Sequence, residues 1–177
     1  VKPFDLNPAG GRNHLISMKS LLSADGYYNV GYRDLADIVK KISAVPLPDL
    51  HMLYRQMVFN VMTGNTDDHL NNFCMLHSDK GWQLSPAFDL VPNVGFNQEH
   101  VLRIGLDTRP PDLNTLLAEA SHFGIKRRQK AMDVVAEIHE VASQWESFFG
   151  WAGVPQKDAR SLSADIEQRL KKTDPGL

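Results

Sequence analysis

The sequence predicts a mainly helical domain that carries one small β hairpin. Apolar residues recur at three- and four-residue spacings in several segments, which is typical of helices with one buried face. Two short apolar runs, at residues 73–76 and 82–84, flank a turn at 78–81 and predict the hairpin. The chain has 177 residues, 42% of them hydrophobic, which is enough for a sizeable core. No repeat or domain boundary interrupts the pattern, so residues 1–177 are expected to form one domain.

Two helices are predicted before residue 43. After an extended start at residues 1–6, residues 13–22 show helical spacing, with Asn13 as a candidate N-cap. Residues 32–42 form the second predicted helix. Its apolar stripe consists of Leu35, Ile38, Val39 and Ile42.

The third predicted helix is the most apolar segment of the chain. Asp49 is its expected N-cap, and Gly64 its expected end, because glycine suits the left-handed residue that closes many helices. Its apolar residues are Leu50, Leu53, Tyr54, Met57, Val58, Val61 and Met62. Such a helix is expected to form the core and to deliver the loop after Gly64 from a rigid base.

The remaining elements follow the hairpin and a loop that reaches about residue 100. In order they are a strand at 101–106, a helix capped by Asp112 and ended by Gly124, a long helix over 126–149, a last helix from Ser161 or Ser163 to about 172, and a frayed tail at 173–177.

Composition excludes several classes of protein. The formal net charge is −2, with a pI near 6.4, so no global basic field points to nucleic acid. The single cysteine, Cys74, excludes an internal disulfide and fits a reducing cytoplasm. No apolar run is long enough to span a membrane, and no signal peptide is recognisable. A cytoplasmic protein is therefore expected.

Three polar residues stand in a pattern that phosphoryl transfer requires. Asp67 and Asn72 have the D-x-x-x-x-N spacing, and Asp89 follows after the hairpin. Enzymes of the protein-kinase type use one carboxylate to accept the proton of the attacking hydroxyl, and an Asn and a second carboxylate to hold Mg²⁺. The usual H-R-D and D-F-G triplets are absent, so the spacing by itself is a moderate signal.

The detailed motif resembles the HipA family of bacterial serine/threonine kinases, the toxins of toxin–antitoxin modules. The chain reads G-N-T-D-x-H-x-x-N and then L-x-P-x-F-D-L, with Asn71 where that family usually has Lys and Phe88 where it often has Tyr. The resemblance implies that Asp67 is the catalytic base, that Asn72 is a metal ligand, and that Asp89 is the main Mg²⁺ ligand. ATP and Mg²⁺ are the implied cofactors.

The first residues resemble the hinge between the two lobes of such kinases. Residues 1–6 read V-K-P-F-D-L against the family's V-x-R-F-D-R, so Phe4 falls where hinge backbone groups meet adenine. Pro3 and Leu6 replace both arginines, and an ordinary N-terminal strand fits the local sequence equally well. The hinge reading implies that the small lobe is absent from this chain, which would be the helical C-lobe. No G-x-G-x-x-G or P-loop occurs in the sequence.

The resemblance also implies partners. In that family the substrates are bacterial translation components, notably aminoacyl-tRNA synthetases, and an antitoxin, which can bind DNA, neutralises the kinase. A separate small-lobe subunit is a further implied partner for this chain.

Two other functions fit parts of the sequence. The first is an inactive pseudokinase that binds an antitoxin. The hinge substitutions Pro3 and Leu6 favour this function, whereas the presence of all three motif residues, Asp67, Asn72 and Asp89, opposes it. A metal-dependent phosphohydrolase could use Asp67, Asp68, His69 and Asp89, but no further His ligands accompany them. For His69, a structural role in which the ring fixes the loop by a hydrogen bond is the preferred interpretation.

Overall fold

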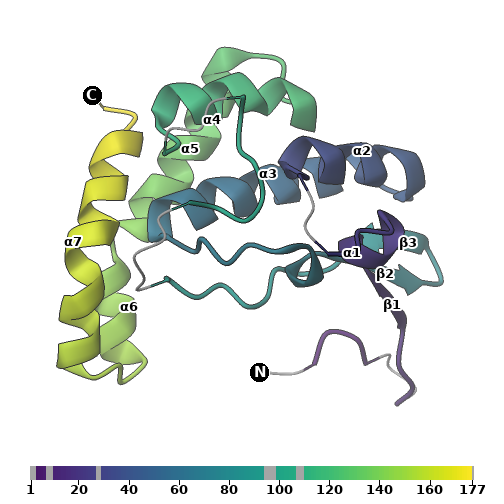
Figure 1. The fold of residues 1–177 in the computed structure, drawn as a ribbon, viewed down its shortest axis with the longest axis horizontal. Coiled ribbons are helices and arrows are strands. Elements are labelled where there is room, and N and C mark those ends of the chain that lie inside the picture. The colour runs from purple at the N-terminus through teal and green to yellow at the C-terminus, as the bar shows by residue number, and fades with distance from the viewer. Residues whose placement is uncertain (1–2, 7–9, 27–28, 94–98, 107–109, 177) are drawn as a thin grey trace.

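The computed structural model describes residues 3–6, 10–26, 29–93, 99–106 and 110–176. Its elements are, in order, β1 (His14–Ser17), α1 (Met18–Leu21), α2 (Tyr32–Ile42), α3 (Pro46–Thr63), the 3₁₀ turn η1 (Leu70–Asn72), β2 (Cys74–Ser78), β3 (Gly81–Leu84), α4 (Leu113–Glu119), the 3₁₀ turn η2 (Ala120–Phe123), α5 (Arg128–Ala142), α6 (Trp145–Trp151) and α7 (Gln156–Thr173). Helices dominate beside one small antiparallel sheet, which confirms the predicted fold class. Figure 1 shows α3 crossing the centre of the molecule, with the sheet toward one end and α7 at the other.

Helix α3 is the centre of the core, as predicted. Pro46 occupies its first turn, where the missing N–H costs nothing, so the helix begins before Asp49. The prediction of Asp49 as the cap is therefore wrong. The Asp49 carboxylate instead accepts the backbone N–H of Leu84 at 2.7 Å and the hydroxyl of Ser43 at 2.6 Å. This acid ties α3 to β3, the strand that leads toward Asp89.

The sheet has one more strand than predicted, in the order β1-β2-β3. The predicted helix over residues 13–22 is wrong at 14–17, which pair antiparallel with β2 so that Ser17 faces Cys74. Pairing satisfies the backbone groups on the free edge of the hairpin, a non-local benefit that outweighs helical spacing. Only α1 remains helical, and the Ser17 side chain caps it by accepting the N–H of Ser20.

Several predicted boundaries are confirmed. Helix α2 spans the predicted residues 32–42. The Asp112 side chain caps α4 by accepting the N–H of Thr115 at 2.8 Å. Gly124 ends the following turn with a φ of 82°, in the left-handed region. These signals are local in sequence, which explains why they could be read without the fold.

The segment 101–106 is not a strand in the part of the chain that the structure describes. It contributes one isolated bridge, in which Arg103 pairs with Gly31 at the start of α2. A Cβ at Gly31 would lie 2.7 Å from the carbonyl oxygen of Arg103, so only glycine permits this approach. The segment therefore lies directly against the N-terminus of α2.

The predicted helix over 126–149 is two helices, α5 and α6. The chain leaves the helical path at Ser143 and Gln144. The Ser143 hydroxyl donates to the carbonyl of His139 at 2.7 Å, a local bond by which serine competes with the backbone of a helix.

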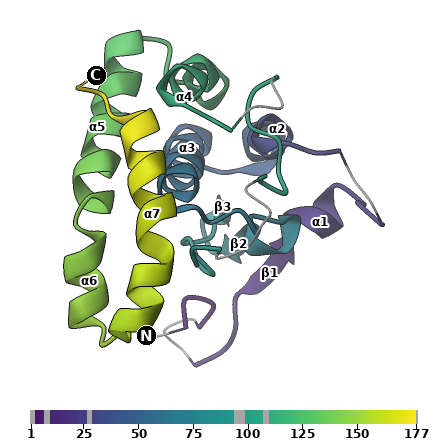
Figure 2. The same ribbon diagram turned by 60° about the vertical axis from the view of Figure 1, so that its left-hand side comes forward.

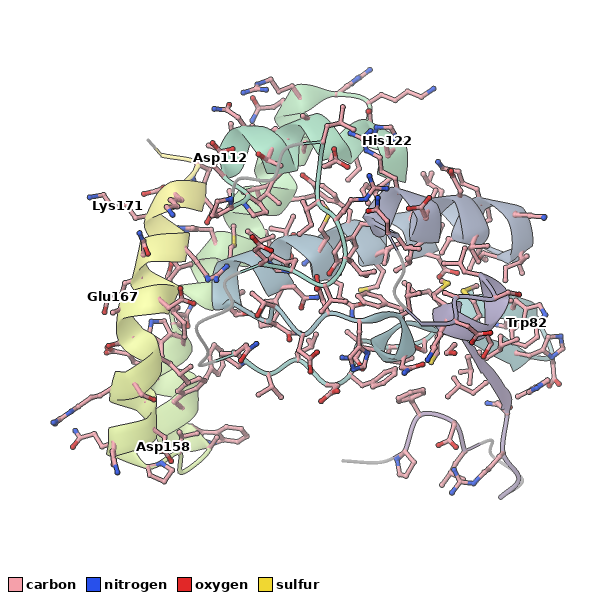
Figure 3. All side chains as sticks on the ribbon, in the orientation of Figure 1. Trp82, Asp112, His122, Asp158, Glu167 and Lys171 are labelled. Atoms are coloured by element: carbon pink, nitrogen blue, oxygen red, sulfur yellow. The ribbon has the colours of Figure 1, made fainter. Side chains whose placement is uncertain are left out.

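Helix α7 begins earlier than predicted. Pro155 precedes its first residue, so the predicted starts at Ser161 and Ser163 fall inside the helix. Thr173 is fully buried, so the frayed tail cannot include it. Figure 2 shows α7 alongside α5 and α6, and in Figure 3 the labelled Glu167 and Lys171 lie on its outer side.

Among the residues described, no helix combines the length and the apolar character that crossing a bilayer demands.

A buried tyrosine on α3 predicts a loss of stability at alkaline pH. Tyr54 is fully buried and donates its hydroxyl to the carbonyl of Leu116 at 3.0 Å. Burial, and secondarily the charge of Glu119, raises the pKa of Tyr54 well above its ordinary value of 10. Because the unfolded chain releases this proton near pH 10 and the folded chain keeps it, stability falls as the pH rises above 10.

We expect Tyr54→Phe to remove this contribution. Between pH 8 and pH 11, the free energy of unfolding should fall less in the variant than in the wild type, by on the order of 1 kcal/mol. Urea denaturation at both pH values measures the difference. Equal losses in the two proteins would contradict the assignment.

Candidate functional site

The three residues predicted to carry chemistry meet in one polar pocket of about 150 Å³. The loop after α3 supplies Asp67, η1 supplies Asn72, and the segment after β3 supplies Asp89. Among the described residues, the lining consists of Asn65, Asp67, Asn72, Asp89, Val91, Pro92 and Asn93. The hairpin of β2 and β3 therefore returns the chain to the loop that it left, as expected from the sequence.

Gly64 connects α3 to this pocket. Its φ of 72° confirms the predicted left-handed end of the helix. Its carbonyl accepts the N–H groups of Thr66 and Asn93, both at 2.9 Å. One peptide oxygen thus holds the two lining segments together.

Asp67 and Asn72 are fixed relative to each other. The Asn72 side-chain amide donates from Nδ2 to the backbone carbonyl of Asp67 at 3.1 Å. This bond commits the nitrogen of the amide and leaves Oδ1 as the group that can bind a cation. The Asp67 side chain is exposed and makes no hydrogen bond or ion pair with a described residue, as a proton acceptor for an incoming hydroxyl requires.

Asp89 has a left-handed backbone, with a φ of 56°. Aspartate tolerates this region better than most residues, yet the conformation is rare enough to mark functional sites. Asn65 lies behind it, because its Nδ2 donates to the Asp89 carbonyl at 3.4 Å and to Asn60 Oδ1 at 3.1 Å. These two hydrogen bonds give Asn65 a structural role beside the pocket.

Asp68 points away from the pocket and into the core. Its carboxylate is fully buried and accepts from Tyr32 Oη at 2.7 Å, His100 Nδ1 at 2.8 Å and the N–H of Leu102 at 3.3 Å. The four-residue set of the phosphohydrolase alternative is therefore split, since Asp68 does not line the pocket with Asp67.

His69 does not hold the loop in the predicted way. Its Nδ1 is buried and forms no hydrogen bond with any described residue, so the expected bond is not found at that atom. The backbone does this work instead, because the carbonyl of His69 accepts the N–H of Asn72 at 2.9 Å and closes η1.

Phe4 does not line the pocket. Its ring lies against Phe88, with centroids 5.6 Å apart and planes tilted by 31°. Phe88 directly precedes Asp89, so residues 3–6 lie beside the segment that carries the candidate metal ligand. Residues 1 and 2 of the predicted hinge lie outside the described residues.

The pocket suits a hard cation such as Mg²⁺. The Asp89 carboxylate and Asn72 Oδ1 are oxygen donors, and Mg²⁺ commonly takes one or two protein oxygens and completes its shell with phosphates and water. The described residues contain no cluster of three His, Cys, Asp or Glu side chains that could hold a metal by themselves. A metal bound by these two protein oxygens would therefore need further oxygen ligands, which a bound phosphate could supply.

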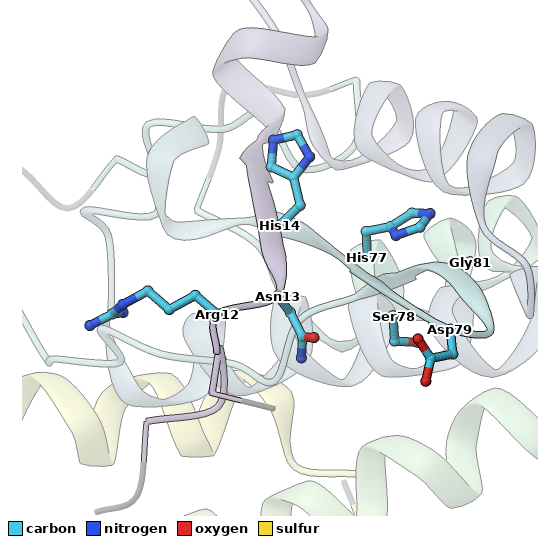
Figure 4. Close-up of a pocket in the computed structure, with 7 residues that line it drawn as sticks. All are labelled: Arg12, Asn13, His14, His77, Ser78, Asp79 and Gly81. Carbon is cyan, nitrogen blue, oxygen red and sulfur yellow. The ribbon is translucent and has the colours of Figure 1, made fainter. Parts of the chain in front are cut away.

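A second, larger cavity of about 480 Å³ lies at the outer end of the sheet. Figure 4 shows that its polar side chains diverge around the strand ends and do not converge on one point. His77 packs edge-on against Trp82, with ring centroids 4.9 Å apart, and His14 lies 5.5 Å from the same indole. The two imidazoles therefore have a packing role there, and the cavity lacks the convergence of the first pocket.

Comparison with known proteins agrees with this geometry. The sequence model described as HipA-like C-terminal domain matches residues 1–145. The chain belongs to this family. Within the HipA-like match lie the loop 64–72 and Asp89, whereas α6 and α7 extend beyond it.

Two individual proteins show the same likeness. The chain is 31% identical over 77 residues to "Putative kinase Y4mE" of Sinorhizobium fredii, a match that covers 42% of this chain and 18% of that protein. It also resembles the solved HipA toxin–antitoxin complex of Shewanella oneidensis with HipB and operator DNA, at a TM-score of 0.74 and 19% identity. That match covers 97% of this chain and 46% of the other, so the HipA-like chain spans less than half of either relative. At 19% identity, the structural match shows a shared fold and nothing more.

Sequence reasoning missed the residues behind the pocket. Tyr32, Asn60 and His100 carry no motif, and they meet only because α2, α3 and the segment after residue 99 pack together. No local signal in the sequence indicated this cluster.

Proposed function

We propose that this chain is the catalytic lobe of a serine/threonine protein kinase that transfers the γ-phosphoryl group of ATP to a protein hydroxyl. The observation that carries the proposal is the convergence of Asp67, Asn72 and Asp89 in one pocket. Membership of the HipA-like family and the kinase name of Y4mE support it.

In this proposal each residue has one task. Asp67 orients the substrate hydroxyl and accepts its proton as the oxygen attacks the γ-phosphorus, while the bond from that phosphorus to the bridging oxygen breaks and ADP leaves. Asn72, through Oδ1, and Asp89, through its carboxylate, would hold Mg²⁺. Mg²⁺ supplies charge neutralisation on the phosphates when bound. Phe4 and its neighbours would lie near the adenine as part of the hinge.

We also propose a biological role, of which the structural neighbour supports the antitoxin partner. A toxin neutralised by an antitoxin is the proposed setting, because the structural neighbour is a complex of HipA with HipB and DNA. A bacterial translation component, such as an aminoacyl-tRNA synthetase, is the proposed substrate, and the cytoplasm the proposed location.

Residues 1–177 alone should bind Mg-ATP weakly. The pocket lining contains no lysine or arginine to neutralise phosphates among the residues described, so a further lobe would supply that contact. We expect at least a tenfold lower affinity for Mg-ATP than in the full-length protein, measured by calorimetry. Equal affinities would contradict the need for a second lobe.

The proposed function is tested with the full-length gene product in bacterial lysate. γ-³²P transfer is compared between the wild type, Asp67→Ala and Asp89→Ala. A labelled protein band that both substitutions abolish supports the kinase and identifies its substrate. If the wild type labels nothing, including itself, while it binds Mg-ATP, the protein is an inactive module that acts by binding its antitoxin.

A further inference from the structure

The buried carboxylate of Asp68, next to the candidate base, accepts three hydrogen bonds from two separate segments. Asp68 accepts from Tyr32 on α2 at 2.7 Å, and from His100 at 2.8 Å and Leu102 at 3.3 Å on the segment that follows the pocket. An ionised carboxylate can only accept, so Tyr32 must donate its hydroxyl proton and His100 must carry a proton on Nδ1.

The direction of the hydrogen bond from Tyr32 to Asp68 determines the direction of the hydrogen bonds that connect Tyr32 to Asn60 and Asn65. Because the Tyr32 hydroxyl proton faces Asp68, its oxygen accepts Asn60 Nδ2 at 2.9 Å. That bond turns Asn60 Oδ1 toward Asn65, whose Nδ2 donates to it at 3.1 Å and to the Asp89 carbonyl at 3.4 Å. The bonds from Asn65 to Asn60, from Asn60 to Tyr32 and from Tyr32 to Asp68 all point toward Asp68, an order in which successive hydrogen bonds strengthen one another. The second bond of Asn65 points outward, to the Asp89 carbonyl.

We call this series of hydrogen bonds, from Asp68 through Tyr32 and Asn60 to Asn65, the relay. Its side chains have little freedom to rearrange. Tyr32 and Asp68 are 0% exposed, Asn60 1% and Asn65 2%, so water cannot replace a lost partner easily. Burial, followed by the charge of Asp68, raises the pKa of Tyr32 well above its ordinary value, which keeps this tyrosine a donor at all physiological pH values.

We propose that Asp68 is a positioning residue, which acts through Tyr32, Asn60 and Asn65 to lock the backbone of Asp89 and the loop of Asp67 in one geometry. The inference deepens the proposed function, since it assigns the support of the base and the metal ligand to one hydrogen-bond relay. The left-handed φ of Asp89 is the conformation that this relay stabilises.

Tyr32→Phe in the full-length protein breaks the relay at its second member. The matched control is Tyr54→Phe, which removes one hydroxyl from a tyrosine that is equally buried and bonded to the carbonyl of Leu116. Hydrogen exchange by mass spectrometry is followed in peptides covering residues 64–72 and 85–93. Tyr32→Phe should accelerate exchange in both peptides relative to Tyr54→Phe, although neither peptide contains the substituted residue.

Magnesium dependence provides a second readout that a general loss of stability would not move. In Tyr32→Phe, the Mg²⁺ concentration for half-maximal phosphoryl transfer should rise about tenfold, because residues that orient a metal ligand commonly set affinity at that scale. Tyr54→Phe should keep the wild-type value. Asn65→Ala, which removes the bonds to Asn60 and to the Asp89 carbonyl but leaves the bond from Tyr32 to Asp68, should accelerate exchange in 85–93.

The outcomes separate the two proposals. If exchange in both peptides is the same in Tyr32→Phe and Tyr54→Phe, the relay is overturned, whatever the activity. If the wild type transfers no phosphate but Tyr32→Phe loosens both peptides, the proposed function fails and the positioning role stands. An unchanged Mg²⁺ requirement in an active Tyr32→Phe enzyme would also overturn the assignment.

Discussion

Asp67→Asn in the full-length protein should lower kcat about 10³-fold and leave the KM for ATP within about twofold. The substitution keeps the volume of the side chain and removes only its capacity to accept a proton. The Asp67 carboxylate is exposed in the pocket and makes no hydrogen bond to a described residue, so its loss should leave the fold intact. The backbone carbonyl of Asp67, which orients Asn72, is unaffected.

Steady-state phosphorylation of the identified substrate provides this measurement. Asp79→Asn is the control, because Asp79 is an exposed acid in the turn between β2 and β3 and takes no part in the pocket. Its kinetics should match the wild type. A loss in Asp67→Asn that appears mainly in KM would show that Asp67 binds nucleotide and is not the base.

Gly64→Ala should lower the free energy of unfolding by about 3 kcal/mol. Two costs combine at this residue. A φ of 72° strains any residue that has a Cβ, and the new Cβ would lie 2.7 Å from Asp165 Oδ2 and 3.0 Å from Arg169 Nε on α7. Those two side chains form an ion pair at 2.7 Å, with Arg169 buried, so neither can move without disturbing the other.

Gly153→Ala separates the two costs. Gly153 also has a φ of 72°, but a Cβ there would meet no atom of the described residues within 4 Å. Its cost should be the backbone strain alone, about 1 kcal/mol. Urea denaturation of both variants gives the comparison. Equal losses would mean that the pair on α7 yields to the methyl group and that the contact is not tight.

Local signals in the sequence account for what could be predicted. The stripe of α2, the cap at Asp112 and the left-handed Gly64 each depend on neighbours a few residues away. The third strand, β1, could not be read in this way, because its partner Cys74 lies far along the chain from Ser17. Helical spacing and pairing competed there, and only the fold decides between them.

In the candidate site too, the residues with a local motif were predicted and those brought together by the fold were not. The motif was sufficient to name Asp67, Asn72 and Asp89, and the fold brings them into one pocket, while their roles remain predictions. The relay behind them was invisible, since Tyr32 and His100 reach Asp68 from sequence distances of 36 and 32 residues. A sequence motif identifies the groups that contact a substrate, whereas the orientation of those groups depends on packing throughout the core.

The charge of the pocket has a consequence for the order in which ligands could enter. Its described lining carries two carboxylates and no cationic side chain, and it begins where α3 presents the negative end of its dipole. Within this lobe, these charges disfavour a free triphosphate and favour a divalent ion. If the protein is the proposed kinase, nucleotide would enter only as a metal complex, and depletion of intracellular magnesium would silence it even when ATP is abundant.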